Sequence, residues 1–463
     1  MLLSVLAALY LLSLGGTGFV AADEPRYASL GRAMAETGDL ITPRLDGAGW
    51  FEKPPLLYWT TALATRLGFH DEWAARLPVA LISLAFLGFF WAVLKREFSV
   101  ETARLATTIL GLSIGWVAYT FVAVTDLEMS VLLGVALLIT LFDTRPGRGW
   151  VAGVFLGLAI LAKAFVPLVL FFPAWTVARG KRLQIPVAAL LVAAPWHLLI
   201  WRVNGSAWWN EYFWKQMVAR FFNPGLEHLQ PFWFYFPVLL GLLFPWTPLA
   251  ALLPARKTWT DVRIQFLGWW VLFGLVFLSV SRNKLPGYVL PLMPALAVIL
   301  AEGLRKAPRP HWWLAASAAM LALLPPSAAL LPAGLLVGIR RAQGDWAGSL
   351  VWSIPFLLAA GAVWWLAHVE KRQEAALVCA LAAAIGFAVV KWTVFPVVDQ
   401  RVSARAFWVE HKDQMKGACL EENLRRDWEY GLNYYAHRAL PHCQGSQGNV
   451  RIGMSGGKLV LLQ

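Results

Sequence analysis

Long apolar runs separated by short polar segments dominate the chain from its first residue to about residue 396. Runs of about 18–22 apolar residues are long enough to cross the hydrocarbon core of a bilayer as helices. A sliding window along the sequence identifies about thirteen such runs, several of them short. They lie at about 1–20, 76–94, 103–122, 127–142, 149–161, 164–178, 184–201, 232–253, 264–281, 286–303, 312–335, 348–367 and 374–396. The pattern predicts an all-α polytopic membrane protein.

Composition supports this class and argues against a soluble one. The 463 residues are 59% hydrophobic and 14% charged, whereas soluble domains average about 25% charged residues. The formal net charge of +13 would suggest nucleic acid in a soluble protein. No stripe of basic residues interleaved with aromatics lies on a polar segment, so we expect no nucleic-acid partner.

The basic residues fall mainly in alternate loops, which predicts the orientation of the chain. Cytoplasmic loops of membrane proteins are enriched in Lys and Arg. The basic positions in these loops are Lys95, Arg96, Arg145, Arg148, Arg179, Lys181, Arg182, Arg256, Lys257, Arg263, Arg305, Lys306, Arg309, Lys371 and Arg372. We therefore expect residues 21–75, residues 202–231 and the C-terminal tail to face outside. The first run lacks a basic start, so we interpret it as a retained span and not as a signal peptide.

Two domains are expected from the change in composition near residue 396. Residues 1–396 form the transmembrane domain, and residues 397–463 form a small outer α/β domain with a helix at Asp427–Leu440 and a strand at Lys458–Gln463. Cys419 and Cys443 flank part of this tail. A disulfide between them is plausible if the tail is exported, and the sequence leaves the pairing open.

The first outer loop, residues 21–75, is expected to contain two interfacial helices. Tyr27, Leu30, Met34 and Ile41 form one loosely spaced apolar face, as in a helix that lies in the membrane interface. Residues 56–67 follow a proline pair that suits a helix start.

The second outer loop, residues 202–231, is aromatic. Such residues form a belt at the water–lipid boundary or line a groove for lipid tails, and both interpretations stay open. The aromatic positions are Trp208, Trp209, Tyr212, Phe213, Trp214, Phe221 and Phe222.

Charged residues gather in loops predicted on one membrane face. Charges held against a bilayer need a polar partner or a polar substrate. Carboxylates can act as general bases or bind a divalent cation, and cations with a tyrosine hydroxyl can neutralise a phosphate. The plain alternatives are surface ion pairs and, for Lys163 and Lys284, snorkelling. Besides these two lysines, the candidate site residues are Asp23, Glu24, Arg26, Lys53, Asp126 and Tyr288.

Several of these residues lie in motifs that resemble those of bacterial lipid A aminoarabinose transferases. The likeness is most specific at Asp23–Ala28 (DEPRYA) and Phe51–Pro55 (FEKPP). It continues at Gly38-Asp39, Pro43, Arg76, Ala162-Lys163, Pro231–Tyr235 and Lys284–Tyr288. The wider group includes the protein O-mannosyltransferases, which are integral-membrane glycosyltransferases of the GT-C fold that use polyprenyl-phosphate sugars.

The resemblance implies an inverting transfer of one sugar from undecaprenyl phosphate, at the periplasmic face of the inner membrane. The implied acceptor is lipid A or another glycolipid, or alternatively an exported protein. The implied catalytic residues are Asp23, Asp126 and Glu24, although the TDLE sequence around Asp126 departs from the commoner family pattern. The implied donor-phosphate ligands are Lys53, Arg26, Tyr288 and Lys284. A divalent cation (Mg, Mn or Zn) at Asp23 and Asp126 is suggested but not required.

Two other classes of function predict different patterns in the sequence. A transporter or flippase for lipid-linked sugars predicts Gly/Pro-broken spans repeated in two halves, with charges at the midplane. A scaffold would need no charged clusters in outer loops. Because the acids cluster at one face, we favour the enzyme and expect Asp23, Asp126, Lys53 and Tyr288 to converge around a single cavity.

Overall fold

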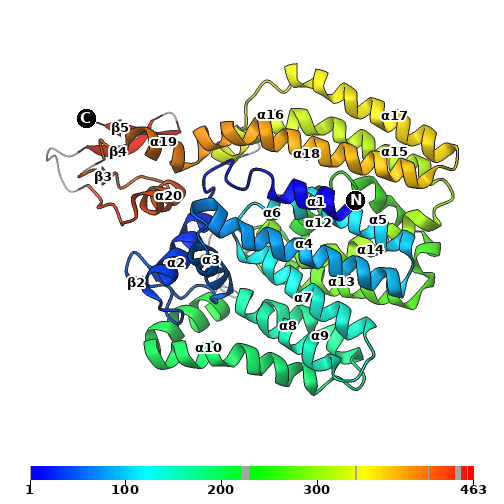
Figure 1. Ribbon diagram of the computed structural model, residues 1–463, viewed down its shortest axis with the longest axis horizontal. Helices are drawn as coiled ribbons and strands as arrows, with labels where there is room; N and C mark the ends of the chain where they lie inside the picture. Colours follow the sequence, from blue (N-terminus) through cyan, green and yellow to red (C-terminus); the bar gives the residue numbers. More distant parts are fainter. Residues whose placement is uncertain are drawn as a thin grey trace.

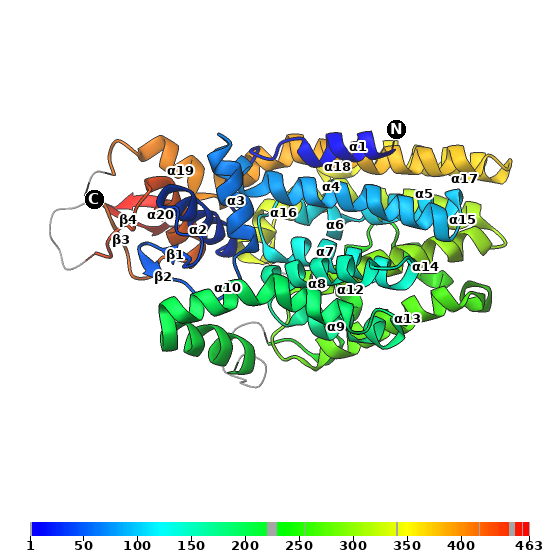
Figure 2. The same ribbon diagram turned by 60° about the horizontal axis from the view of Figure 1, so that its bottom comes forward.

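The structure, a computed structural model, describes residues 2–219, 229–253, 255–338, 341–415, 417–443, 450–455 and 457–462. It is a bundle of helices with a small sheet at one end (Figure 1). Two helices of the first outer loop, α2 (Asp23–Thr37) and α3 (Leu56–Arg66), lie at the same end as the sheet in both views (Figures 1 and 2). A two-stranded ribbon, β1 (Arg44–Leu45) and β2 (Ala48–Gly49), joins them.

The bundle contains the remaining helices up to residue 402. In its first half these are α1 (Leu2–Leu11), α4 (Asp71–Glu97), α5 (Val100–Gly111), α6 (Ile114–Tyr119), α7 (Thr125–Phe142), α8 (Arg148–Lys163), α9 (Val166–Val177), α10 (Gln184–Trp208) and η1 (Trp209–Ala219). In its second half they are η2 (Phe232–Phe234), α12 (Tyr235–Leu242), η3 (Thr247–Leu252), η4 (Arg256–Thr260), α13 (Val262–Val280), η5 (Pro286–Leu292), α14 (Met293–Lys306), α15 (Pro310–Met320), η6 (Leu321–Leu323), α16 (Leu324–Val337), η8 (Gly348–Ser353), α17 (Ile354–His368) and α18 (Arg372–Val402).

The multi-span prediction is confirmed, at a coarser count than the sequence suggested. Within the described ranges, 8 helical segments are long and apolar enough to cross a membrane, and three apolar helices are shorter. Every predicted run contains helix, but the first run, 1–20, is helical only over Leu2–Leu11, and some other runs are divided. The run at 103–122 breaks between α5 and α6, and the run at 232–253 breaks into η2, α12 and η3. Pro237, Pro245 and Pro248 fall in the latter, where each removes a backbone donor.

Two spans form the centre of the bundle. In the most apolar window of each span, 89% of the residues are buried for α7 and 94% for Pro286–Lys306, whereas 22–44% are buried for the other candidate spans. A helix that is apolar on all sides needs protein or lipid all round it. Asp126, in the first turn of α7, therefore belongs to one of the two most enclosed spans of the protein.

The two helices of the first outer loop pack against each other. Gly31 of α2 permits this contact, since a Cβ there would lie 2.5 Å from the Thr61 Cβ and 3.2 Å from the Tyr58 carbonyl oxygen. Tyr27, Leu30 and Met34 are buried. The predicted helices are confirmed, but Ile41 lies beyond the end of α2, and the other three apolar side chains are covered by protein.

The aromatic loop divides into two sets of side chains. Tyr212 stacks on Trp208 with ring centroids 5.0 Å apart, and both are buried. Trp209 and Trp214 are exposed, as a belt would require, so the choice between belt and groove stays a prediction. Phe221 and Phe222 lie outside the described residues.

A buried ion pair joins the first outer loop to the bundle. The Arg76 guanidinium donates to both Glu24 carboxylate oxygens, at 2.7 and 2.9 Å. It also donates to the backbone carbonyls of Leu14, Thr17 and Gly18. Neither charged side chain is exposed to solvent. All five guanidinium N–H groups are thus used, and α2, α4 and the segment after α1 are held together.

The C-terminal tail forms the predicted mixed unit. It contains α19 (Ala404–His411), α20 (Arg426–Ala436) and a sheet of order β3-β4-β5, from β3 (Cys419–Leu420), β4 (Arg451–Ser455) and β5 (Lys458–Leu462). β4 pairs parallel with β3 and antiparallel with β5. The predicted helix and strand are confirmed in type, and Gln463 lies outside the described residues.

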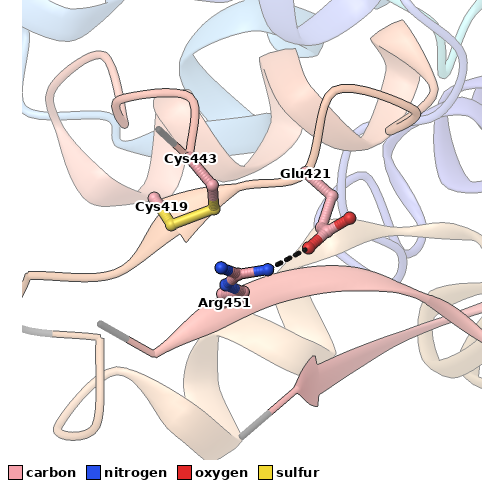
Figure 3. Close-up of a disulfide and its surroundings, with 4 residues drawn as sticks. All are labelled: Cys419, Glu421, Cys443 and Arg451. Atoms are coloured by element: carbon pink, nitrogen blue, oxygen red, sulfur yellow. Dashed lines mark ion pairs between the residues drawn. A yellow bond between two sulfur atoms is a disulfide. The ribbon is translucent and has the colours of Figure 1, made fainter. Parts of the chain in front are cut away.

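Cys419 and Cys443 form a disulfide across this unit (Figure 3). Near it, Arg451 pairs with Glu421 at 3.5 Å. The covalent link closes a loop across 24 positions of sequence, and such closure restricts the unfolded chain. The question that the sequence left open is therefore answered in favour of the pair.

A network of hydrogen bonds and ion pairs connects the C-terminal unit to the membrane domain. The Tyr435 hydroxyl donates to Glu72 of α4 at 2.6 Å. Arg405 pairs with Asp399 at 2.8 Å and with Glu72 at 3.2 Å. The Gly18 backbone N–H donates to Asp399 as well. The tail therefore rests on α4 and on the segment that precedes α2.

We expect Arg76→Met to destabilise the protein by about 3–5 kcal/mol, because it leaves the Glu24 carboxylate buried without its partner. Thermal unfolding of the purified protein in detergent measures the effect. Arg96→Met, at an exposed pair with Glu97, is the matched control and should change stability by less than about 1 kcal/mol. Equal stability of the two variants would contradict this assignment.

Candidate active site

The first charged cluster lies at the start of α2. Arg26 pairs with Asp23 one turn earlier and with Glu52 at 3.5 Å. Asp23 and Glu24 occupy the first turn of the helix, where the helix dipole favours negative charge. The Asp23 side chain is 46% exposed, whereas that of Arg26 is 10% exposed. The cluster therefore offers an accessible carboxylate beside a mostly buried cation.

Aromatic rings surround the Arg26 guanidinium. Its Cζ lies 4.9 Å from the Trp50 ring centroid, 5.6 Å from that of Tyr27 and 5.4 Å from that of Tyr430. Tyr430 comes from α20, so the C-terminal unit contributes to this cluster. Such cation–π contacts hold a desolvated guanidinium in place.

Three buried donors in and near this cluster have no hydrogen-bond acceptor among the described residues. They are the Arg26 Nε, the Trp50 Nε1 and the Tyr58 hydroxyl. Native proteins leave few buried donors unsatisfied, and each exception calls for an explanation such as an ion or ligand. Oxygen-rich groups, such as a phosphate or a sugar, would satisfy all three.

Electrostatics keeps these groups in their ordinary protonation states. Burial opposes the charge on Arg26, but Tyr27, Asp23 and Glu52 outweigh it and raise the pKa of the guanidinium. Burial raises the pKa of the Tyr27 and Tyr58 hydroxyls well above 10. Arg26 therefore stays cationic and both tyrosines stay neutral donors at physiological pH.

The second charged cluster lies where α7, α8 and η5 meet. The Lys163 ammonium donates to the Asp126 carboxylate at 2.5 Å and lies 4.2 Å from the Tyr288 ring centroid. Gly287 permits this approach, since a Cβ there would lie 2.8 Å from Asp126 Oδ1 and 2.6 Å from the Tyr119 hydroxyl. The structure thus brings Asp126 and Tyr288 together, as predicted, through a lysine that the sequence left as a weak candidate.

Glu24 does not fit the catalytic role that the resemblance implied. Its two oxygens accept from Arg76, from the Val20 backbone N–H at 2.9 Å and from the Ala123 backbone N–H at 3.0 Å. A carboxylate has about four acceptor positions, and all are occupied. Glu24 is fully buried, so it acts as a positioning residue between the first outer loop and the segment that precedes α7.

The two remaining lysine candidates differ in their surroundings. Lys284 is buried and donates to the carbonyls of Gln230, at 3.1 Å, and Ser281. These contacts connect the segment before η5 to the segment before η2. Burial also lowers the pKa of the Lys284 ammonium. Lys53 is half-buried and follows Glu52, which belongs to the Arg26 cluster.

The two clusters are connected by short contacts. Glu24 binds the backbone of Ala123, three residues before Asp126. On the other side, the Thr60 hydroxyl of α3 donates to Glu128 of α7 at 3.0 Å. A cavity of about 870 Å³ elsewhere in the bundle is lined by none of the predicted site residues. The expectation of a single shared cavity therefore stays a prediction.

The predicted divalent cation has no complete set of protein ligands here. Within the described ranges, no group of three or more His, Cys, Asp or Glu side chains gathers as a metal site would require. The partners of Asp23 and Asp126 are a guanidinium and an ammonium, and cations compete with a metal for the same oxygens. A divalent cation at Asp23 and Asp126 therefore stays a prediction.

Sequence reasoning predicted Tyr288 but missed three other aromatic members of the two clusters. Tyr119 and Tyr430 have no motif around them that distinguishes them from ordinary membrane aromatics, and Trp50 stands just before the Phe51–Pro55 motif without being part of it. Lys163 did have a signal, because a lysine at the end of an apolar run is costly without a partner.

We expect a double-mutant cycle to show strong coupling between Lys163 and Asp126. Lys163→Met alone leaves a mostly buried carboxylate unpaired and should cost about 3 kcal/mol. Lys163→Met combined with Asp126→Asn should recover a large part of that loss, because the uncompensated charge is removed. Thermal unfolding in detergent measures each variant, and Lys95→Met at the opposite end serves as the control. Simple additivity of the two substitutions would argue against the pair.

Comparisons with known proteins show what the chain is similar to. The sequence model of the family described as dolichyl-phosphate-mannose-protein mannosyltransferase matches residues 52–201. An undecaprenyl phosphate-alpha-4-amino-4-deoxy-L-arabinose arabinosyl transferase from Serratia proteamaculans is 33% identical over 326 residues, which cover 64% of this chain and 57% of that protein. The corresponding protein from Pseudomonas paraeruginosa is 26% identical over 510 residues, which cover 100% of this chain and 92% of that protein.

The fold is shared with a solved structure. The crystal structure of ArnT from Cupriavidus metallidurans bound to undecaprenyl phosphate has a TM-score of 0.77 and 22% sequence identity, over 95% of this chain and 84% of that one. In the matches to the first relatives, the chain spans less than two thirds of their length, at 59% and 57%. In sequence the chain is therefore similar to the aminoarabinose arabinosyl transferases, and it shares the multi-span membrane fold of ArnT.

Proposed function

We propose that the protein transfers 4-amino-4-deoxy-L-arabinose from undecaprenyl phosphate to lipid A. The relatives named above carry this donor and sugar in their names, and lipid A is the acceptor that the resemblance implied. The single observation that carries the proposal is the Arg26 cluster, with its three buried donors that lack acceptors. Those donors, beside a guanidinium and an accessible carboxylate, suit a phosphate-linked sugar.

The proposed reaction follows from the chemistry of the leaving group. A bond forms between an acceptor oxygen and the anomeric carbon of the sugar, and the bond from that carbon to the phosphate oxygen breaks with inversion. The phosphate leaves as a stable anion and needs no proton. It needs positive charge around its oxygens, which Arg26, Lys53 and Lys163 supply.

The proposed acid–base group is a carboxylate at the acceptor. When the acceptor oxygen carries a proton, Asp23 takes it, since its side chain is exposed and lies at the edge of the cluster. Asp126 is more enclosed and is held by Lys163. We assign it to orienting Lys163 and Tyr288 toward the phosphate, so that charge develops against fixed partners.

The proposed location is the bacterial inner membrane, with the site and the C-terminal unit in the periplasm. The basic loops support this orientation, and the disulfide between Cys419 and Cys443 suits an oxidising compartment. In this arrangement the thirteen apolar runs are thirteen crossings or part-crossings, residues 1–396 are the transmembrane domain, and residues 397–463 are the outer domain.

A second candidate is transfer of a hexose to an exported protein. The family model that matches residues 52–201 is named for mannosyl transfer to protein, and the chemistry at the phosphate would be the same. Mass spectrometry of lipid A and of exported proteins, from cells with and without the gene, separates the two. Loss of an aminoarabinose mass from lipid A supports the first proposal, and loss of a hexose mass from protein supports the second.

We expect Lys53→Ala to lower the transfer rate by about 10²–10³-fold, since removing one group that stabilises a developing anion has this effect. Purified full-length protein is assayed with radiolabelled undecaprenyl phosphate-aminoarabinose and lipid A. Lys95→Ala, at the opposite end of α4, is the matched control and should retain the wild-type rate. A near-wild-type rate for Lys53→Ala would exclude a role at the phosphate.

We expect Asp23→Asn to lower the rate by about 10²–10⁴-fold, as loss of a general base does, without a comparable loss of donor affinity. Donor affinity is measured separately, by binding of the labelled lipid. Glu36→Gln, at an exposed position on the same helix, provides the comparison. If Asp23→Asn weakens donor binding and leaves turnover unchanged, the carboxylate positions the donor and is not the base.

A further inference from the structure

A cavity lies at the end of the bundle away from the charged clusters. It has a volume of about 870 Å³, within the range of about 300–1,000 Å³ typical of ligand pockets. The starts of α1, α5, α15 and α18 and the ends of α4 and α14 surround it. Figures 1 and 2 place the label of the N-terminus away from the end that holds α2, α3 and the sheet.

The walls of this groove are apolar. Leu3, Val100, Leu377 and Leu381 line it, and each exposes about two fifths of its side chain. Exposed apolar side chains that gather in one concave surface mark a binding site or a contact with membrane. Because α4, α14, α15 and α18 belong to segments long and apolar enough to cross a membrane, acyl chains are the natural contents.

The rim of the groove carries both signs of charge. Arg104 lines it and donates to the neutral Gln373 side chain at 3.1 Å, so that its positive charge is not cancelled by that partner. Glu101 and Glu374 also line it. Neither forms an ion pair within the described ranges. Arg305 and Arg372 also line the groove, and they pair with Glu302 at 2.9 Å and with Glu370 at 3.1 Å, respectively.

A headgroup with both charges matches this rim. The phosphate of a phospholipid suits Arg104, and a primary ammonium suits the carboxylates of Glu101 and Glu374. Basic pockets between spans on the cytoplasmic side bind lipid headgroups, and the loops at this end are those that the basic residues predict to be cytoplasmic. We propose that this groove binds one amine-bearing, zwitterionic phospholipid of the cytoplasmic leaflet.

The site is separate from the proposed transfer reaction. It shares no residue with either charged cluster, and binding can be measured without turnover. Failure of one proposal therefore leaves the other intact.

Native mass spectrometry of the full-length protein in detergent tests the proposal. Phosphatidylethanolamine, phosphatidylcholine and phosphatidylglycerol with identical acyl chains are titrated separately. We expect one bound lipid, with phosphatidylethanolamine the tightest, because a primary ammonium donates hydrogen bonds to carboxylates and a trimethylated one does not. Tighter binding of phosphatidylglycerol would overturn the headgroup assignment. Full competition by millimolar inorganic phosphate would overturn the assignment to a lipid.

Three variants locate the site. Arg104→Gln should weaken binding of all three lipids about fivefold, which is the effect of one basic residue at a membrane surface. Glu101→Gln combined with Glu374→Gln should abolish the preference for phosphatidylethanolamine over phosphatidylcholine and leave phosphatidylcholine binding unchanged. Leu381→Trp should reduce binding of every lipid by narrowing the groove.

Arg256→Gln is the matched control, since Arg256 is an exposed arginine of η4 that does not line the groove. Elution volume and helical circular dichroism confirm that each variant is folded. Wild-type lipid binding in a folded Arg104→Gln variant, or an equal loss in Arg256→Gln, would refute the site.

Discussion

The buried pair of Arg76 and Glu24 is the contact on which the arrangement of the outer loops depends. Two fully buried charges are tolerated only when each is paired and hydrogen-bonded, and both conditions are met here. The same carboxylate binds the backbone at Ala123. One ion pair therefore fixes the start of α2, which carries Asp23 and Arg26, relative to the segment that leads to Asp126. A reaction that needs both acids requires this relation to be rigid.

The two charged clusters contain the same kinds of residues, but their carboxylates differ in exposure to solvent. In each, a carboxylate contacts a cation that also lies against aromatic rings: Asp23 with Arg26 beside Trp50, and Asp126 with Lys163 beside Tyr288. Pairing lowers the cost of keeping charge near the bilayer, and the rings exclude water, which strengthens the remaining interactions. An anion that enters between such groups meets fixed positive charge, and the protein need not reorganise to receive it.

The sequence predicts elements well and pairings poorly, for a physical reason. Hydrophobic runs, proline starts and local spacing report short-range constraints, so the spans, α2, α3 and β5 were all predicted close to their places. The decisive contacts join residues 52 positions apart, for Arg76 and Glu24, and 37 apart, for Lys163 and Asp126. The sequence around a lysine does not distinguish an ammonium that extends to the membrane surface from one that pairs with a carboxylate. The family motifs pointed to Glu24 without revealing that it is saturated by hydrogen bonds.

The C-terminal unit links these observations. It was predicted as a small outer domain of limited stability, and the structure gives it a disulfide and a polar network with α4. Its contact with the site is specific, because Tyr430 lies against the same guanidinium that pairs with Asp23. Arg32 also donates to the Tyr434 carbonyl at 2.9 Å. In the proposed function, an acceptor that reaches Asp23 lies close to this unit, since α20 packs against α2. Under that proposal the shape of the tail is a natural place for acceptor selectivity, apart from the proposed phosphate chemistry of the membrane domain.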